Sequence, residues 1–202
     1  MSGDVSQPMF FLDTPSVTAD ARRLFDSDVD EIGYVMNATR LWAYQPVVLE
    51  GMFGLMKDVS IAADLSVRQR GILVAAMAST LRDSYCSLSW GSKLAGQADA
   101  AVATGVLRGD DDGLTPAEHA LAEWARTITN DPGHASQTDI DSLRAAGFSD
   151  GHIFAITTFV ALRIAFSTVN GALGALPDAS LRTSVPTEVI GAVPYGRPIA
   201  PD

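Results

Sequence analysis

The stretch from residue 66 to residue 81 constrains the fold more than any other part of the sequence. Ser66 is a typical residue for the start of a helix, and the positions from Ile72 to Ala78 that follow are all apolar. A helix that is apolar on every face is surrounded by protein rather than by water. The sequence therefore predicts a central helix here, with enough further elements to cover it.

The elements expected around this helix are helices as well. Thr115, Pro116 and Glu118 form a capping box with proline in the first turn, which is a fairly specific start signal. Apolar residues recur at helical spacing from Ile153 to Ile164. No run of alternating β-branched residues between turns indicates a strand. The predicted fold class is all-α.

The chain divides into an extended N-terminal arm (1–17), a single helical domain (18–176) and an irregular C-terminal tail (177–202). A length of 202 residues with 47% hydrophobic residues is sufficient for one sizeable core. Three apolar residues, Phe10 to Leu12, are expected to attach the arm to a neighbouring surface.

At the start of the domain, the pattern predicts two successive helices. The first is short, is capped by Thr18 or Asp20, and runs through Phe25. The second is longer and begins at Asp28.

The charge of the chain limits its partners. A net charge of −10 argues against nucleic acid and an anionic membrane surface, because both attract basic proteins. The most apolar segment, 153–169, contains Arg163 and is too short for a membrane span, and no signal peptide is recognised. The lone Cys86 excludes an internal disulfide and suits a reducing cytoplasm, which is the predicted location.

Two stretches resemble the alkylhydroperoxidase D and carboxymuconolactone decarboxylase superfamily. The first is the central helix followed by Ser84-Tyr85-Cys86, and the second is Leu143 to Asp150 with the apolar helix after it. The resemblance spans roughly residues 30–176. It implies an alkylhydroperoxidase D-like helical bundle that assembles into a homo-oligomer (trimer, hexamer or dimer), with its site near a subunit interface.

The chain departs from the chemistry of that family at three positions. Where the peroxidases have a glutamate, a first cysteine and a histidine, this sequence has Gly71, Asp83 and Trp90. Only Cys86 and the preceding Tyr85 are retained, so the C-x-x-C motif is reduced to D-x-x-C. A dithiol peroxidase needs a second thiol to resolve the sulfenic acid. Neither the dithiol mechanism nor the decarboxylase mechanism therefore transfers intact.

The retained residues leave three hypotheses open. In the first, Cys86 lies in the first turn of a helix, where the helix dipole lowers its pKa, and it is a redox-active cysteine with Asp83 as base and an external thiol as reductant. The opposing effect is that a nearby carboxylate raises a thiol pKa. In the second, Asp83 performs acid–base chemistry on a small substrate, with Tyr85, Arg82 and Trp90 around it. In the third, Cys86 is a buried small hydrophobe in a non-catalytic oligomeric scaffold.

The remaining candidates carry less chemistry. His119 and Glu123 lie one helical turn apart, but a surface pair is favoured over a metal site, because no third ligand is evident. No cofactor is predicted. Arg163 lies within an apolar helix and therefore needs a carboxylate partner, for which Glu50 or a residue of another subunit is the candidate.

Overall fold

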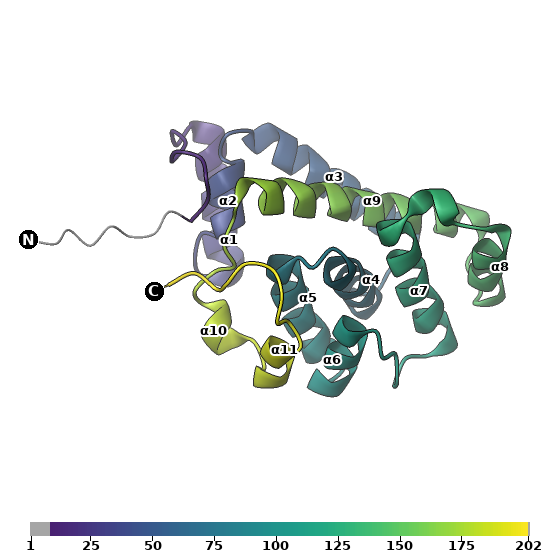
Figure 1. The fold of residues 1–202 in the computed structure, drawn as a ribbon. Coiled ribbons are helices and arrows are strands. Elements are labelled where there is room, and N and C mark those ends of the chain that lie inside the picture. The colour runs from purple at the N-terminus through teal and green to yellow at the C-terminus, as the bar shows by residue number, and fades with distance from the viewer. Residues whose placement is uncertain (1–8, 202) are drawn as a thin grey trace, which may run out of the picture.

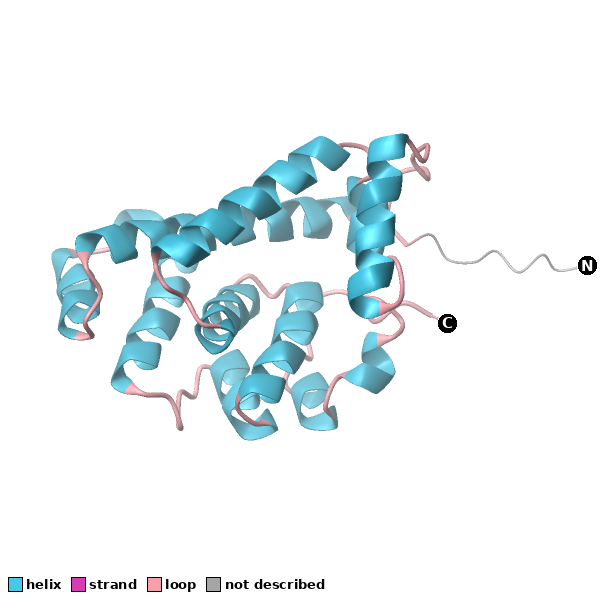
Figure 2. Cartoon of the chain, turned by 180° about the vertical axis from the view of Figure 1, so that it is seen from behind, coloured by secondary structure: helices cyan, strands magenta, loops and turns pink. Residues whose placement is uncertain are grey.

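In the computed structural model, which describes residues 9–201, all regular structure in that range is helical (Figure 2). The helices are α1 (Ala19–Ile32), α2 (Asn37–Trp42), α3 (Pro46–Ala62), α4 (Val67–Thr80), α5 (Ser84–Gln97), α6 (Ala100–Arg108), α7 (Pro116–Asn130), the 3₁₀ turn η1 (Pro132–His134), α8 (Gln137–Ala145), α9 (Asp150–Leu173), α10 (Leu181–Ser184) and α11 (Thr187–Gly191). The predicted all-α fold class is confirmed.

Helix α4 is the centre of the molecule, as its composition predicts. Every residue from Gly71 to Ala78 is buried, and α4 packs against α5, α6, α7 and α9. Figure 1 shows α4 enclosed between α5, α7 and the long α9. The residues around Cys86 are positioned by this packing, because α5 begins only a few residues after α4 ends.

The predicted helix starts at the polar caps are confirmed. Ser66 Oγ accepts a hydrogen bond from the Gln69 backbone N–H at 3.1 Å, and Thr115 caps α7 in the same way. Such side-chain acceptors satisfy backbone donors that have no partner within the helix.

Two helices are present at the start of the domain, α1 and α2, but the predicted break between them, after Phe25, is in the wrong place, because the chain breaks at residues 33–36. Thr18 caps α1, which continues without a break to Ile32 and ends at Gly33, where φ is +85°. Asp28 does not start a helix. It is buried in α1, and its Oδ2 accepts a hydrogen bond from the backbone N–H of Met36 at 3.0 Å.

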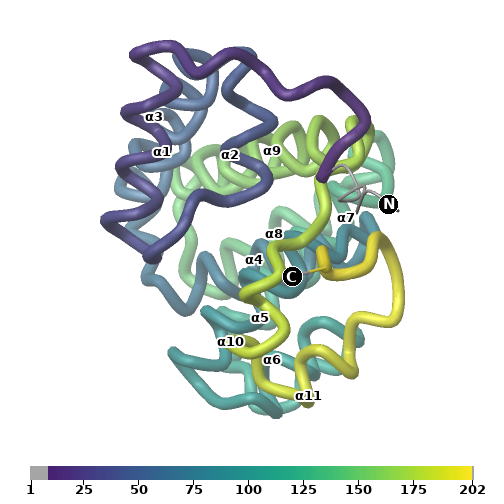
Figure 3. The backbone as a smooth tube through the Cα atoms, turned by 90° about the vertical axis from the view of Figure 1, so that its left-hand side faces the viewer, coloured from purple at the N-terminus to yellow at the C-terminus, as the bar shows by residue number. Residues whose placement is uncertain are grey.

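The C-terminal segment is more regular than its composition predicts. It contains α10 and α11, which pack against α5 and, for α11, also against α6. Figure 3 shows this segment folding back along α5 and α6. Proline residues obscured the short helices in the sequence, because Pro186 directly precedes α11 as its N-cap.

The described part of the N-terminal arm pairs with the end of α9. The Phe11 N–H donates to Leu173 O at 2.8 Å, and the Leu176 N–H donates to Met9 O at 3.0 Å. Phe10 is buried, whereas Phe11 remains 68% exposed. The rest of the predicted arm, residues 1–8, and the last residue of the tail lie outside the described residues.

Helix α9 is long and apolar enough to cross a membrane by length and composition alone. It carries the buried Arg163 and packs against α3, α4, α7 and α8. A core helix of a soluble protein passes the same test, and 44% of the most apolar window of α9 is buried in this structure.

Candidate functional site

Cys86 lies in the first turn of α5, directly after its cap. Asp83 is the N-cap residue, and its Oδ1 accepts hydrogen bonds from the backbone N–H groups of Tyr85 (2.9 Å) and Cys86 (3.3 Å). The sequence prediction that the D-x-x-C motif begins a helix is therefore confirmed. The cap holds the carboxylate of Asp83 close to the thiol.

Cys86 is buried but lines a cavity of about 320 Å³ between α1, α3, α5 and α9. We call this the thiol cavity. Its lining consists of Glu31, Met36, Ala38, Phe53, Met56, Lys57, Ser60, Arg70, Tyr85, Cys86, Ser89, Trp90, Lys93, Phe159, Arg163 and Phe166. Three residues that the sequence analysis assigned to the site, Tyr85, Cys86 and Trp90, are thus brought together.

Arg163 of α9 lies beside the thiol. Its Nη2 is 3.6 Å from Cys86 Sγ, and its guanidinium stacks between the rings of Trp90 (5.0 Å) and Phe166 (5.3 Å). Glu50 instead contacts Arg23 at 3.4 Å, so it is not the partner of Arg163, and the alternative of an acidic residue from another subunit stays a prediction. Ser167, one turn further along α9, donates a hydrogen bond to Cys86 Sγ at 3.3 Å.

The environment of Cys86 opposes ionisation. Burial and the nearby carboxylate of Asp83 raise the pKa of the thiol to about 12, although Arg163 and the hydrogen bond from Ser167 act in the opposite direction. The expectation that the helix dipole would lower this pKa is therefore wrong. The sequence shows the position of Cys86 in its helix but not how completely α9 excludes water from the sulfur.

The hydroxyl of Tyr85 belongs to a buried hydrogen-bond network. Its hydroxyl donates to Asp178 Oδ2 at 2.6 Å and accepts from the Ala38 N–H at 3.1 Å. Asp178 Oδ1 accepts in turn from the Asn37 N–H at 2.7 Å. Burial raises the pKa of Tyr85 well above its usual value, and Asp178 adds to the shift. The hydroxyl of Tyr85 is therefore already hydrogen-bonded within the protein, and Tyr85 contributes its ring to the cavity lining.

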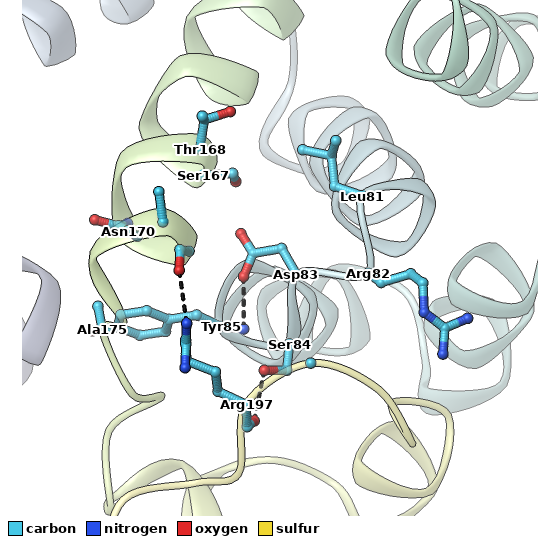
Figure 4. A pocket seen from close by; sticks show the side chains of 13 residues that line it. Leu81, Arg82, Asp83, Ser84, Tyr85, Ser167, Thr168, Asn170, Ala175 and Arg197 are labelled. Atoms are coloured by element: carbon cyan, nitrogen blue, oxygen red, sulfur yellow. Dashed lines mark hydrogen bonds between the residues drawn. The ribbon is translucent and has the colours of Figure 1, made fainter. Parts of the chain in front are cut away.

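Asp83 and Arg82 line a different cavity, of about 590 Å³, which we call the Asp83 cavity. Figure 4 shows the Asp83 carboxylate turned toward α9, near Ser167. Its Oδ2 is buried without a hydrogen-bond partner among the described residues. Arg82 is directed away, and its guanidinium lies over the ring of Tyr195 at 5.3 Å. The structure thus brings Arg82, Asp83 and Tyr85 to one cavity and Tyr85, Cys86 and Trp90 to the other, and it turns the guanidinium of Arg82 away from the Asp83 carboxylate.

The C-terminal segment closes the Asp83 cavity. Ser84 Oγ donates to Arg197 O at 2.7 Å, and Arg197 Nη2 donates to Gly171 O at 2.9 Å (Figure 4). Gly196 has a φ of +75°, and a Cβ at that position would meet Ser84 Oγ at 2.7 Å. Only glycine allows the segment to approach α5 this closely.

Gly71 stands where the resemblance to the peroxidases places a glutamate. A Cβ at Gly71 would lie 3.2 Å from Leu94 Cβ, because α4 and α5 are in close contact there. A side chain at this position would require Leu94 to shift by a few tenths of an ångström. The close packing of α4 against α5 therefore suits glycine at this position.

Several groups near the thiol were not identified from the sequence as site residues. Ser167 and Lys93 belong to helices whose patterns indicate only core and surface faces, whereas Arg70, with Arg40 and Arg68, is a candidate for anion binding from the sequence for which a surface position is favoured. Arg163 gave a different signal, because a charged residue interrupts an otherwise apolar helix. Its neighbours on other elements could not be inferred, because they come from two helices that are distant in the sequence, α3 and α5.

The pair His119 and Glu123 gains a third neighbour in Asp111, and the three offer ligand atoms within 4.8 Å of one another. However, both oxygens of Asp111 accept hydrogen bonds from Arg126 at 2.7 Å. A guanidinium thus already occupies the position that a cation would take. The cluster is an ion-pair network on α7.

The fold is that of proteins of the alkylhydroperoxidase D type. An uncharacterised peroxidase-related protein from Ralstonia eutropha with the alkylhydroperoxidase core is similar over 86% of this chain and 95% of its own, with a TM-score of 0.77 and 19% identity. A peroxidase-related protein from Silicibacter is similar over 89% of this chain and 98% of its own, with a TM-score of 0.79 and 18% identity.

The debrominase Bmp8 has the same fold. Its cysteine-to-alanine variant in complex with 2,3,4-tribromopyrrole is similar over 85% of this chain and 94% of its own, with a TM-score of 0.68 and 18% identity. No family model and no curated protein sequence matches the chain. At these identities the likeness establishes the alkylhydroperoxidase D-like helical bundle that the sequence resemblance implied.

Proposed function

We propose that this chain is a small-molecule oxidoreductase, related to the peroxidases of its fold, in which Cys86 is the single redox-active residue. One observation carries the proposal: Cys86 Sγ borders the thiol cavity with Arg163 at 3.6 Å and Ser167 at 3.3 Å. A thiolate formed there would have a cation and a hydrogen-bond donor in place. These are the groups that stabilise the reactive form of a cysteine.

The proposed reaction begins with transfer of the thiol proton to Asp83. The sulfur attacks the terminal oxygen of a hydroperoxide ROOH in the thiol cavity, the O–O bond breaks, and the alkoxide takes a proton from solvent to leave as ROH, while Asp83 returns its proton to solvent in the Asp83 cavity. Cys86 is then a sulfenic acid. One molecule of an external thiol converts it to a mixed disulfide with loss of water, and a second molecule releases Cys86 with formation of the external disulfide.

The high pKa of Cys86 implies a slow reaction in the resting state. At a pKa of about 12, only about one thiol in 10⁵ is ionised at pH 7. Proton transfer to Asp83 within the complex avoids the need for a resting thiolate, because the base is already adjacent. Bmp8, which binds tribromopyrrole, supports a small substrate for this fold.

The test is mass spectrometry of the protein after mild treatment with cumene hydroperoxide in the presence of dimedone, which traps sulfenic acids. We expect one dimedone adduct per chain at Cys86 and none in Cys86→Ser. Reduction of the oxidised protein by an added thiol completes the cycle. A Cys86 that stays unmodified while the hydroperoxide is intact would remove the proposal.

The second candidate is acid–base chemistry at Asp83, as in the decarboxylases of the superfamily. It is favoured by the buried, unpartnered Oδ2 of Asp83, which lines a cavity of its own. An activity on a small carbon acid that survives Cys86→Ser but not Asp83→Asn would support it. The scaffold hypothesis required Cys86 to have no cavity beside it, and the thiol cavity counts against it.

We also propose that the chain forms a homo-oligomer and acts in the cytoplasm. Large apolar side chains remain exposed on α3 and α9, among them Val47 (61%), Leu55 (55%), Ile61 (68%) and Phe154 (76%). Exposed apolar residues in such number are typical of association surfaces. Light scattering on the purified protein tests this proposal, and a mass of 21.3 kDa, that of one chain, would contradict it.

A further inference from the structure

The thiol cavity has the opposite charge to the rest of the protein. The chain has 14 lysine and arginine residues against 24 aspartate and glutamate residues. Four of these cations, Lys57, Arg70, Lys93 and Arg163, line this one cavity, and Glu31 is the only carboxylate in its lining. A local positive potential inside an acidic protein attracts anions to that place specifically.

Arg163 lines this cavity and, among residues 9–201, has no carboxylate partner. It is 6% exposed, its Nη1 faces Met56 Sδ at 4.0 Å, and its Nε has no hydrogen-bond partner. In residues 9–201, no carboxylate lies within ion-pair distance of it. Its nearest polar neighbour is the thiol of Cys86. A buried guanidinium without an anion is costly, and such groups are ordinarily paired.

Two more cations border the path from solvent to Arg163. The Nε of Arg70 is also buried without a partner. The exposed residue Lys93 reaches inward, with its ammonium group 4.9 Å from the centre of the Trp90 ring. Burial lowers the pKa of Lys93, the charge of Glu31 opposes this, and the charges of Arg163 and Arg70 lower the pKa further. An anion in the cavity would relieve the mutual repulsion of the three cations.

The walls of the cavity are apolar and largely flat. Phe53, Phe159, Phe166, Trp90 and Met56 contribute to the lining, and the Phe53 and Phe166 rings lie 5.5 Å apart. Such walls bind the body of a ligand by burial, whereas the cation fixes its orientation. A volume of about 320 Å³ accommodates a single ring with a small substituent.

We propose that the thiol cavity binds a small aromatic carboxylate, with the carboxylate at Arg163 and the ring between the aromatic walls beside Cys86. The planar fork of a guanidinium matches a carboxylate in two parallel hydrogen bonds. As a statement about substrate class, this inference rests on the proposed function of Cys86, because the bound ring lies next to its sulfur.

The experiment is calorimetric titration of the full chain with benzoate, and with benzamide as the neutral molecule of the same shape. Benzoate is expected to bind at least about tenfold more tightly, because it forms charge-assisted hydrogen bonds that the amide lacks. Inorganic phosphate is the third probe, and we expect it to bind more weakly than benzoate, since it gains nothing from the apolar walls. Equal affinity for benzoate and benzamide, or tighter binding of phosphate, would overturn the proposal.

Variants locate the site. Arg163→Met is expected to lower benzoate affinity by about tenfold or more, and Arg163→Lys, which keeps the charge but not the fork, by less. Arg70→Gln at the path is expected to weaken binding a few-fold. Arg22→Gln, on the exposed face of α1, is the matched control and should leave the affinity unchanged. Circular dichroism shows whether each variant is folded, and the comparison of benzoate with benzamide needs no variant at all.

The outcomes distinguish the proposed anion site from the proposed redox function of Cys86. Cys86→Ser is expected to bind benzoate like the wild type, because the anion is held by arginine and not by the thiol. Benzoate binding with an inert Cys86 would support the anion site and remove the redox function. A Cys86 that is oxidised by hydroperoxide, in a protein that does not distinguish benzoate from benzamide, would remove the anion site alone.

Discussion

Two arginine residues of this protein differ in how their hydrogen-bond donors are satisfied: Arg126 is paired with carboxylates, whereas Arg163 is not, within the part of the chain that the structure describes. Arg126 on α7 donates to both oxygens of Asp111 at 2.7 Å, to Glu123 at 3.1 Å and to Val106 O at 3.1 Å. Arg163 on α9 is more deeply buried, yet its contacts are a thiol, a thioether and two aromatic rings.

The contrast identifies the site more clearly than the cysteine does. Donors of a structural arginine are satisfied within the chain, as the region around α7 shows. The region between α5 and α9 leaves buried donors of Arg163 and Arg70 without partners. Such groups persist where a ligand completes them. The experiments below test this contrast in order of decreasing effect.

The largest effect expected is the pH dependence of Cys86 alkylation. With a thiol pKa of about 12, the rate with iodoacetamide should rise about tenfold per pH unit, or about 1,000-fold from pH 7 to pH 10, without a plateau. In urea the same thiol regains its ordinary pKa, and its rate should level off near pH 9 to 10. A plateau of the alkylation rate below pH 9 in the folded protein would show that Arg163 lowers the pKa of Cys86 more than burial raises it.

The same pKa predicts how stability depends on pH. The folded state retains the Cys86 proton up to about pH 12, whereas the unfolded chain loses it near pH 8.5. Between these values the folded state binds more protons, so the free energy of unfolding falls as the pH rises. Cys86→Ser lacks this contribution. Urea titrations of both proteins at pH 8 and pH 10 should therefore show a steeper loss in the wild type.

The second prediction compares the two arginines directly. Arg126→Met should lower the free energy of unfolding by about 3 kcal/mol, because it leaves Asp111, whose side chain is 5% exposed, buried without its partner. Arg163→Met should change it by no more than about 1 kcal/mol, since no carboxylate depends on it. Urea unfolding measures both. Equal losses would mean that Arg163 is as much a structural residue as Arg126.

The third prediction concerns Tyr85, which borders the thiol cavity but belongs to a completed network. Tyr85→Phe should lower the free energy of unfolding by about 1 to 2 kcal/mol, because Asp178 and the Ala38 N–H each lose a hydrogen-bond partner. Oxidation of Cys86 by hydroperoxide should change little. A large loss of oxidation at unchanged stability would instead make the hydroxyl of Tyr85 part of the reaction.

The sequence predicted the parts of this structure that local rules determine. The apolar run of α4 requires a central helix, and the caps at Ser66 and Thr115 follow from hydrogen bonding within a few residues. The start of α5 at Asp83 follows from the same rule and placed Cys86 correctly in a first turn. The length of α1 was underestimated because the polar residues Asp26 to Asp28 were interpreted as a break between two helices, although the helix continues through them.

The thiol cavity depended on contacts that the sequence does not show. The pKa of Cys86 is set mainly by burial and by Asp83, and the burial comes from α9, far along the chain. Arg82 was assigned to the site by adjacency to Asp83, but its backbone has a φ of +56° and its side chain is directed to Tyr195. Adjacency in sequence therefore located the turn of the helix, but not the direction of each side chain.

The smallest expected effect is the most informative about mechanism, and it concerns Asp83. The carboxylate raises the pKa of Cys86 through its charge, so a purely electrostatic role predicts that Asp83→Asn increases the thiolate fraction and speeds oxidation. A base that accepts the thiol proton predicts the opposite. Asparagine retains the acceptor oxygen that caps α5, so the helix should remain intact.

We expect Asp83→Asn to slow the oxidation of Cys86 by hydroperoxide about three- to tenfold at pH 7, less than the roughly hundredfold or more typical of general-base catalysis, because loss of the carboxylate charge also increases the thiolate fraction. Iodoacetamide provides the control in the same variant, because its reaction depends on the resting thiolate and should become faster. Slower oxidation together with faster alkylation assigns the proton transfer to Asp83. If both rates rise, Asp83 acts only through its charge, and the open region between α5 and α9 contains a cation and a thiol but no base.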